Sequence, residues 1–169
     1  WNTTDGLNWN QVTDSSRWRR RFGHTTIAFQ EYMWTIGGGL HEGYAVYYSS
    51  DGQHAEVALN NEELAKRHEH TCLPCDNQIW VLGGESLSAM SDVWSSPDGM
   101  TWTKIAENTG FGQRTAHTSL CIDNMLYVMG GKSNVALGNV YESGDGQNWT
   151  CLDTSADWTR LDAYPEALH

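Results

Sequence analysis

Short apolar runs separated by turn residues fill the chain, and they come in groups of four. Within residues 117–152 the runs are His117–Ile122, Met125–Met129, Asn139–Ser143 and Asn148–Leu152, separated by Asp123-Asn124, Gly130-Gly131 and Asp145-Gly146. Runs of this length that are rich in β-branched and aromatic residues, with turn residues between them, predict strands.

The same group of four occurs twice more. Residues 70–105 contain His70–Cys75, Ile79–Leu82, Asp92–Ser96 and Thr101–Ile105, and residues 24–59 contain His24–Phe29, Met33–Ile36, Ala45–Ser49 and Ala55–Leu59. Helix-forming residues gather only at Asn61–Arg67, where one turn of helix is predicted. We therefore predict an all-β chain built from four-stranded antiparallel units.

Three markers keep one spacing of 46 or 47 residues along the chain. They are a glycine doublet (Gly37-Gly38, Gly83-Gly84, Gly130-Gly131), an Asp-Gly pair (Asp5-Gly6, Asp51-Gly52, Asp98-Gly99, Asp145-Gly146) and an Arg-x-x-His pattern (Arg21/His24, Arg67/His70, Arg114/His117). A fixed period of this size indicates repeated units that stack or form a ring. A single unit cannot bury both of its faces, so its neighbours are part of its fold.

Each marker has a structural and a functional interpretation. Asp-Gly between apolar strands predicts a tight hairpin, because that turn needs a positive φ. The doublet lets another backbone approach closely, and this is favoured over phosphate binding because no helix follows it. The repeated Arg and His could ring the mouth of an axial channel. We favour a structural role, with His bonding a neighbouring loop carbonyl or Arg tying two units through a carboxylate.

Units of this length fit the blades of a β-propeller, and their markers resemble the kelch family. In that pattern an aromatic residue and then a Trp follow the doublet, as in Gly84, Trp94, Trp102 and in Gly131, Tyr141, Trp149. After Gly38 the aromatic is Tyr47, but Ala55 stands where the Trp is expected. The Ser-Ser-x-Asp-Gly-x-x-Trp stretch is also similar to the Asp-box hairpin of sialidases, with different spacing.

The resemblance implies a ring of about six or seven blades, of which this chain would supply about three and a half. The whole blades are residues 24–59, 70–105 and 117–152; residues 1–12 would be the outer hairpin of a split blade, and residues 153–169 an inter-blade loop leading to a missing strand. We therefore expect the rest of its own propeller, or a second copy, to cover the exposed blade edges.

The charge and hydropathy of the chain argue against two classes of partner, nucleic acid and the membrane interior. The chain has 10 Lys and Arg against 21 Asp and Glu, a formal net charge of −11, which argues against nucleic acid. No apolar run approaches the roughly 18 residues that a membrane helix needs, so no membrane insertion is expected. A secreted or periplasmic location is slightly favoured.

Four cysteines leave two interpretations open. Cys72-Leu-Pro-Cys75 looks like a metal or redox motif, but a strand would point these two side chains to opposite faces. No second pair of this spacing completes a zinc site. We therefore favour small core residues for Cys72 and Cys75, and we expect no metal and no cofactor. The sequence leaves the state of all four cysteines, which include Cys121 and Cys151, open.

The predicted topology assigns the loops to two faces. Turns between first and second strands and between third and fourth strands are tight, whereas second-to-third loops, such as Gly39–Tyr44, Glu85–Ser91 and Lys132–Gly138, and inter-blade loops are longer. Long loops on a rigid scaffold are where binding residues gather.

The candidate ligand-binding residues on the long-loop face are Arg17, Trp18, Arg19, Arg20, His41, Glu42, Tyr44 and Trp158. The basic cluster around Trp18 could clamp a carboxylate or sulfate, although an ordinary solvated loop is the favoured interpretation. Carboxylates such as Glu62, Glu63 and Glu85 could form an acid/base pair only if the fold brings them together. We predict a non-catalytic binding or scaffold module for a protein or glycan; the alternative is a fragment of a kelch-type carbohydrate-active enzyme, similar to sugar mutarotases or galactose oxidase.

Overall fold

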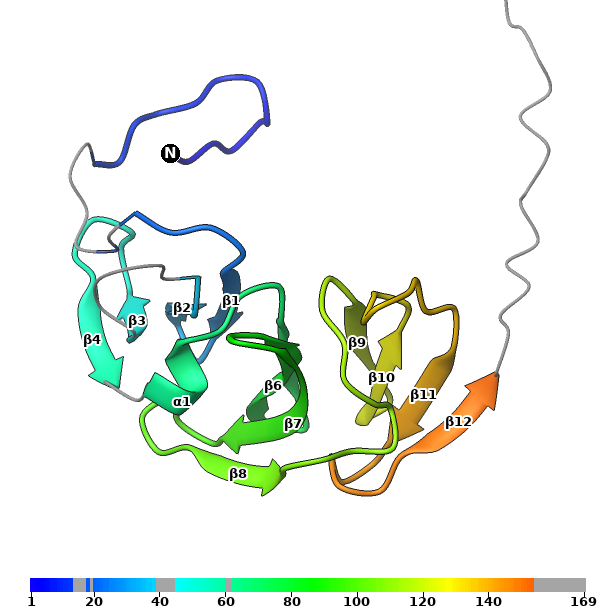
Figure 1. Cartoon of the computed structure of the whole chain (residues 1–169). Helices are drawn as coiled ribbons and strands as arrows, with labels where there is room; N and C mark the ends of the chain where they lie inside the picture. Colours follow the sequence, from blue (N-terminus) through cyan, green and yellow to red (C-terminus); the bar gives the residue numbers. More distant parts are fainter. Residues whose placement is uncertain (14–17, 19, 39–44, 60–61, 154–169) are drawn as a thin grey trace, which may run out of the picture.

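The fold consists of three four-stranded antiparallel sheets that follow one another along an arc (Figure 1). The computed structural model describes residues 1–13, 18, 20–38, 45–59 and 62–153. The first sheet contains β1 (Thr25–Phe29), β2 (Tyr32–Ile36), β3 (Val46–Ser49) and β4 (Glu56–Leu59); the second contains β5 (Thr71–Cys75), β6 (Gln78–Glu85), β7 (Ala89–Ser96) and β8 (Thr103–Ala106); the third contains β9 (Thr118–Ile122), β10 (Met125–Met129), β11 (Val140–Ser143) and β12 (Thr150–Asp153).

Strands within each sheet are adjacent in the order in which they occur in the sequence, as in a propeller blade. The helix α1 (Glu62–Ala65) leads from the first sheet to the second, where one helical turn was predicted. The prediction of an all-β chain of four-stranded antiparallel units is therefore confirmed. No helix of the described residues is long and apolar enough to cross a membrane.

One predicted boundary differs. The loop predicted at Glu85–Ser91 is wrong, because β6 and β7 continue pairing through Gly84–Met90 and Glu85–Ala89 and leave only residues 86–88 to connect them. In residues 1–12 the chain turns back on itself through an isolated antiparallel bridge between Asn2 and Asn10.

The short turns between first and second strands are tight, as predicted. Gln30 and Glu31 have φ values of 47° and 67°, and Asp76-Asn77 and Asp123-Asn124 also have positive φ. Two successive positive φ values match the right-handed twist of the strands that such a turn joins. These turns lie on the face opposite to the longer loops.

A recurring hydrogen-bond pattern fixes the Asp-Gly turns. In the first sheet Ser49 Oγ accepts from the Gly52 amide at 2.9 Å, and Asp51 Oδ1 accepts from the Gln53 and His54 amides at 2.8 Å. The same bonds recur at Ser96/Asp98 and Ser143/Asp145, with Thr3/Asp5 as a fourth copy. Backbone amides favour the ionised carboxylate, and they lower the pKa of Asp145 to about 2.

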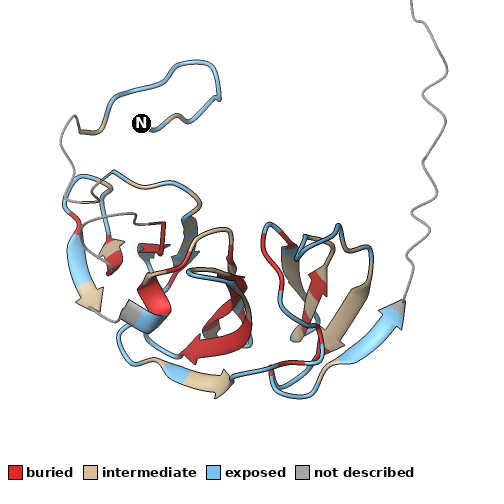
Figure 2. Cartoon of the chain, in the orientation of Figure 1, coloured by how far each residue is buried: buried red, intermediate tan, exposed pale blue. Residues whose placement is uncertain are grey.

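The core lies between the sheets (Figure 2). Strand β6 shows why, because alternate side chains of a strand point to opposite faces. Ile79 and Val81 pack against the first sheet, whereas Trp80 and Leu82 pack against the third. The central sheet is thus buried on both faces by its neighbours, as repeated units of this kind require.

The glycine doublets lie where two backbones meet. A Cβ at Gly37 would lie 2.5 Å from the Arg67 carbonyl oxygen of the next sheet, and a Cβ at Gly38 would lie 2.6 Å from His24 Cβ of its own sheet. The Gly38 amide also donates to that Arg67 carbonyl at 2.7 Å. The doublet therefore serves packing and hydrogen bonding between sheets rather than phosphate binding.

Tryptophan rings cover the Asp-Gly turns of the next sheet. The ring of Trp34 lies over Gly99 and the ring of Trp80 lies over Gly146, so close that an added Cβ at either glycine would overlap the ring. Each indole also donates to a carbonyl of its own sheet, Trp34 to Phe29 and Trp80 to Cys75, both at 3.0 Å. A tryptophan at this position therefore couples one sheet to the next.

The interpretation of Cys72 and Cys75 as plain core residues holds for Cys72 and is wrong for Cys75, while Cys151 is exposed. Cys75 of β5 and Cys121 of β9 form a disulfide that joins the second and third sheets. Cys72 is a buried thiol in the other inter-sheet core, so Cys72 and Cys75 do face opposite sides of the strand. The pairing escaped sequence reasoning because these two cysteines occupy different positions within their repeats.

Candidate functional site

A cavity of about 670 Å³ opens between the second and third sheets, on the face that carries the longer loops. Three segments line it: the end of β6 with Glu85 and the turn that follows, the β8–β9 connection with residues 110–115, and the β10–β11 connection with Lys132 and Asn134. A cavity of this size can hold a small ligand of one or two sugar units. The long-loop face thus contains a concave site at the seam of two blades.

Arg114 lies beneath the cavity and organises it. Its Nε donates to the Phe111 carbonyl at 3.0 Å, Nη1 donates to the Gly130 carbonyl at 3.0 Å, and Nη2 donates to Asn139 Oδ1 at 3.2 Å. Its guanidinium also lies 5.3 Å from the centroid of the Tyr141 ring. Arg114 therefore holds the β8–β9 connection against β10 and β11.

The charge of Arg114 is not matched by a carboxylate among the described residues. Only 1% of the residue is exposed, and its hydrogen-bond partners are neutral oxygens. Burial lowers the pKa of the guanidinium, which nevertheless stays protonated because an arginine titrates far above neutral pH. A positive charge in a poorly hydrated environment therefore borders the cavity.

Lys132 adds a second positive charge at the rim of the cavity. Its side chain is 57% exposed, and Nζ lies 3.7 Å from Glu69 Oε2. The Lys132 backbone is fixed by reciprocal hydrogen bonds with Thr115 at 2.9 and 3.0 Å. The backbone of Lys132 is thus fixed, while its ammonium group is exposed at the cavity rim.

The loop that carries Lys132 is held in shape by its own hydrogen bonds. The Leu137 amide donates to the Gly131 carbonyl at 2.8 Å, and the Ser133 amide donates to the Val135 carbonyl at 3.0 Å. A loop fixed in this way presents its polar side chains without a large ordering cost on binding. The cavity is therefore a preorganised polar site.

Most of the residues predicted to bind a ligand lie outside the described residues: Arg17, Arg19, His41, Glu42, Tyr44 and Trp158. Two of the basic cluster are described. Trp18 packs its ring 6.2 Å from that of Tyr47, and Arg20 is exposed. The described contact of Trp18 is with its own sheet.

The repeated arginines make their hydrogen bonds within one unit. Arg67 donates to both carboxylate oxygens of Asp92 and to the Gly83 carbonyl, all in the second blade. Arg21 donates to the Trp18 and Gly37 carbonyls in the first. The expectation of an Arg–carboxylate tie between units is therefore wrong; the link between units is the arginine carbonyl, which accepts from a glycine of the preceding doublet.

Two of the repeated histidines lie in the seams between sheets. His117 Nε2 lies 2.9 Å from Thr71 Oγ1 of the second sheet, so a hydroxyl of the neighbouring unit is one of its partners. His70 is buried against Gly37, and both of its ring nitrogens lack a hydrogen-bond partner among the described residues. Burial lowers the pKa of His117 to about 4 and lowers that of His70 as well.

The sequence did not predict the residues around the cavity as a site. It did assign one of the lining loops, Lys132–Gly138, to the binding face. A usable signal exists in the repeat itself. Asn139 occupies the position of Asp92, so the sequence already places an uncharged partner beside one of the repeated arginines. The fold does not bring Glu63 and Glu85 together as an acid/base pair, because Glu63 pairs with Lys104 while Glu85 lines the cavity.

No protein-family model matches the chain, and no curated protein gives a significant match.

Proposed function

We propose that the chain is a kelch-type propeller segment that acts as a non-catalytic binding module, and that the cavity between its second and third blades binds the acidic group of a glycan. The kelch assignment rests on the register of the Gly-Gly, aromatic and Trp markers with the four-stranded sheets. An acidic protein side chain is the second candidate ligand, since it offers the same carboxylate.

The observation that carries the proposal is the uncompensated charge of Arg114. In the second blade the equivalent arginine, Arg67, is neutralised by Asp92, and Asn139 stands in the place of that carboxylate in the third blade. The cavity lies over the third-blade arginine. An incoming carboxylate or sulfate would supply the negative charge that the protein itself provides in the second blade.

The test is a binding titration with glucuronate- or sulfate-bearing oligosaccharides against their neutral counterparts. Lys132→Gln should weaken binding of the acidic sugar about fivefold to tenfold, because a rim contact to an anion is lost. Lys104→Gln is the matched control, since Lys104 pairs with Glu63 and Glu107 away from the cavity. Equal binding of acidic and neutral sugars would refute the proposal.

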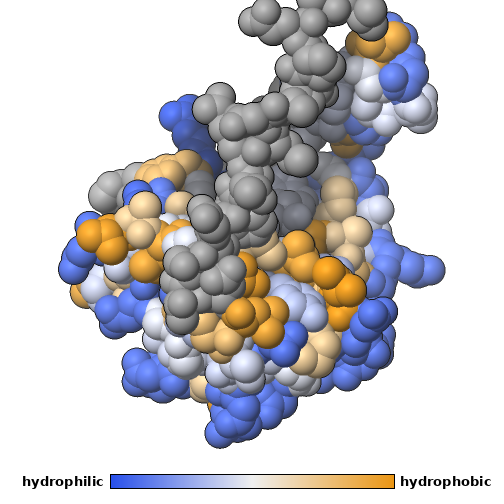
Figure 3. All heavy atoms as spheres, turned by 90° about the vertical axis from the view of Figure 1, so that its right-hand side faces the viewer, coloured by the Kyte–Doolittle hydropathy of each residue, from blue (hydrophilic) through white to orange (hydrophobic). Residues whose placement is uncertain are grey.

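We further propose that additional blades, from the same propeller or a second copy, pack on the open face of the third sheet. Tyr127 is the third copy of the position held by Trp34 and Trp80, but no described glycine turn lies against its ring. Ile122 and Leu152 of this sheet are 54% and 51% exposed, and apolar side chains are visible on this side of the molecule (Figure 3). Such a face favours association.

The assembly proposal is tested by the mass of the particle in solution. Light scattering should give a mass above that of one 169-residue chain when no further blades are present, and Tyr127→Ser should reduce it. A strict monomer over a wide range of concentrations would contradict association through this face. That outcome would leave the cavity and its ligand unaffected.

A further inference from the structure

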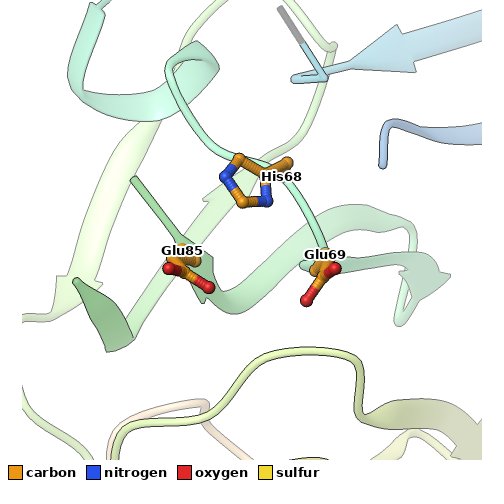
Figure 4. A group of neighbouring side chains, drawn as sticks. All are labelled: His68, Glu69 and Glu85. Carbon is orange, nitrogen blue, oxygen red and sulfur yellow. The ribbon is translucent and has the colours of Figure 1, made fainter. Parts of the chain in front are cut away.

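His68, Glu69 and Glu85 form a compact group between the second and third blades, beside the cavity (Figure 4). Each offers one ligand atom, and these atoms all lie within 4.8 Å of one another. Figure 4 shows the three side chains at the corners of a triangle, with the imidazole of His68 above and the carboxylates of Glu85 and Glu69 below it on either side. Two bonds of about 2.0 to 2.2 Å require ligand atoms no more than about 4.4 Å apart, so small side-chain rotations would bring these three atoms onto a single divalent cation.

Backbone hydrogen bonds hold all three residues in place. The His68 amide donates to the Glu85 carbonyl and the Glu85 amide donates to the His68 carbonyl, both at 2.9 Å, so the two side chains start from paired positions. The Glu69 amide donates to the Gly23 carbonyl of the first blade, and the Glu69 carbonyl accepts from Ala116 of the third, each at 2.9 Å. Glu69 has a φ of 53°, which few non-glycine residues adopt without a structural reason.

Protein contacts orient the side chains of the group, but they do not use all of its possible ligand atoms. Thr115 Oγ1 donates to Glu69 Oε2 at 2.7 Å, an outer contact of the kind that fixes a carboxylate ligand. His68 Nδ1 is buried and has no hydrogen-bond partner among the described residues. A buried ring nitrogen without a partner is costly, and a metal ion would satisfy it.

The group brings two carboxylates, those of Glu69 and Glu85, beside one imidazole, a set of charges that suits a cation. Lys132 Nζ is the only described cation within 4.0 Å of the Glu69 carboxylate, and it is exposed enough to turn toward solvent or toward a ligand in the cavity. The site can therefore accept a metal without breaking a buried ion pair.

We propose that His68, Glu69 and Glu85 bind a divalent transition-metal ion of the zinc type. One imidazole nitrogen and two carboxylate oxygens suit such ions, whereas Ca²⁺ prefers a larger set of oxygen ligands. Three protein ligands leave at least one coordination position open. Because Glu85 also lines the cavity, that open position would lie at the cavity edge. The inference rests on the three side chains alone and does not depend on glycan binding.

The test uses the protein chain as it stands, stripped with a chelator and titrated with Zn²⁺ against a chromogenic competitor. Binding of one equivalent is expected, and His68→Gln and Glu85→Gln should each weaken it by at least about tenfold. A rise in melting temperature with Zn²⁺ should accompany binding to the wild type and be absent from both variants. Ca²⁺ at the same concentration should not produce that rise.

His54→Gln is the matched control, because His54 is an exposed histidine that contacts one carboxylate, that of Asp51, at 2.7 Å. Its affinity for Zn²⁺ should equal that of the wild type. Circular dichroism and the melting temperature without metal establish that each variant is folded. Zn²⁺ binding that survives His68→Gln in a folded protein, that falls equally in His54→Gln, or that is absent from the wild type would overturn the proposal.

Discussion

Arg67 forms two hydrogen bonds with Asp92, at 2.9 and 2.8 Å, and both residues are buried within the second blade. Trp94 Nε1 donates to the same carboxylate at 2.7 Å. In the third blade the equivalent pair is Arg114 and Asn139, joined by one bond at 3.2 Å. One repeat unit therefore neutralises its arginine internally, and the next does not.

Asp92→Ala should destabilise the fold strongly, because it leaves the Arg67 charge buried and unpaired. Loss of one partner of a buried ion pair costs about 3 to 5 kcal/mol. Asn139→Ala is the comparison, and loss of its single neutral acceptor should cost about 1 kcal/mol. Urea denaturation measures both free energies of unfolding. Equal effects of the two substitutions would contradict the difference described between the blades.

Gly99→Ala should be much more destabilising than Gly6→Ala. Both glycines have nearly the same φ, 74° and 75°, so the backbone cost of a Cβ is the same at both. Only at Gly99 would the Cβ overlap the Trp34 ring, and overpacking of this kind adds about 1 to 3 kcal/mol. Thermal unfolding of the two variants measures the difference. A melting temperature as high for Gly99→Ala as for Gly6→Ala would show that Trp34 does not couple the two sheets.

Loss of the Cys75–Cys121 disulfide should loosen the second and third sheets from each other. Cys75→Ser should lower the free energy of unfolding by about 2 to 4 kcal/mol under oxidising conditions, and Cys151→Ser should have little effect. Addition of a reductant should destabilise the wild type and leave Cys75→Ser unchanged. Mass spectrometry of peptides without reduction identifies the bond. A disulfide of this kind persists in oxidising compartments.

Stability should fall as the pH drops below neutral. Burial holds the pKa of His117 at about 4, below the value of about 6.5 that it has in the unfolded chain. A lowered histidine pKa means that the folded state favours the neutral ring, so this stability is complete above pH 6.5 and is lost as the pH falls toward 4. His117→Gln should make the melting temperature less dependent on pH over this window. An unchanged slope would show that His117 does not govern the acid response.

The periodic pattern was sufficient to predict the strands, because each apolar run and each turn pair has a local cause. The Gly37-Gly38 doublet could be assigned to packing for the same reason, since it recurs in every unit. The disulfide and the His68, Glu69 and Glu85 group could not be predicted in this way. Cys75 meets Cys121, and Glu69 approaches Glu85, only through the lateral packing of one sheet on the next, which no local pattern encodes.

The cavity was missed for a related reason. A cluster of charged residues, such as the one around Trp18, is visible in the sequence. The proposed anion site depends instead on the absence of a carboxylate beside Arg114. A single asparagine such as Asn139 does not indicate a binding site in a sequence. It contributes to the proposed site because it is an uncharged partner of the buried Arg114. The comparison of equivalent positions between repeats is the route by which such a site can be recognised.

The most direct test of the proposed function is the affinity of Asn139→Asp for an acidic oligosaccharide, measured by calorimetry beside the wild type. The substitution gives the third blade the Arg–carboxylate pair that the second blade already has, so the fold should be kept or stabilised. We predict that binding of the acidic sugar falls at least tenfold, because the new carboxylate neutralises Arg114 and repels the ligand. Unchanged affinity in the folded variant would contradict the account.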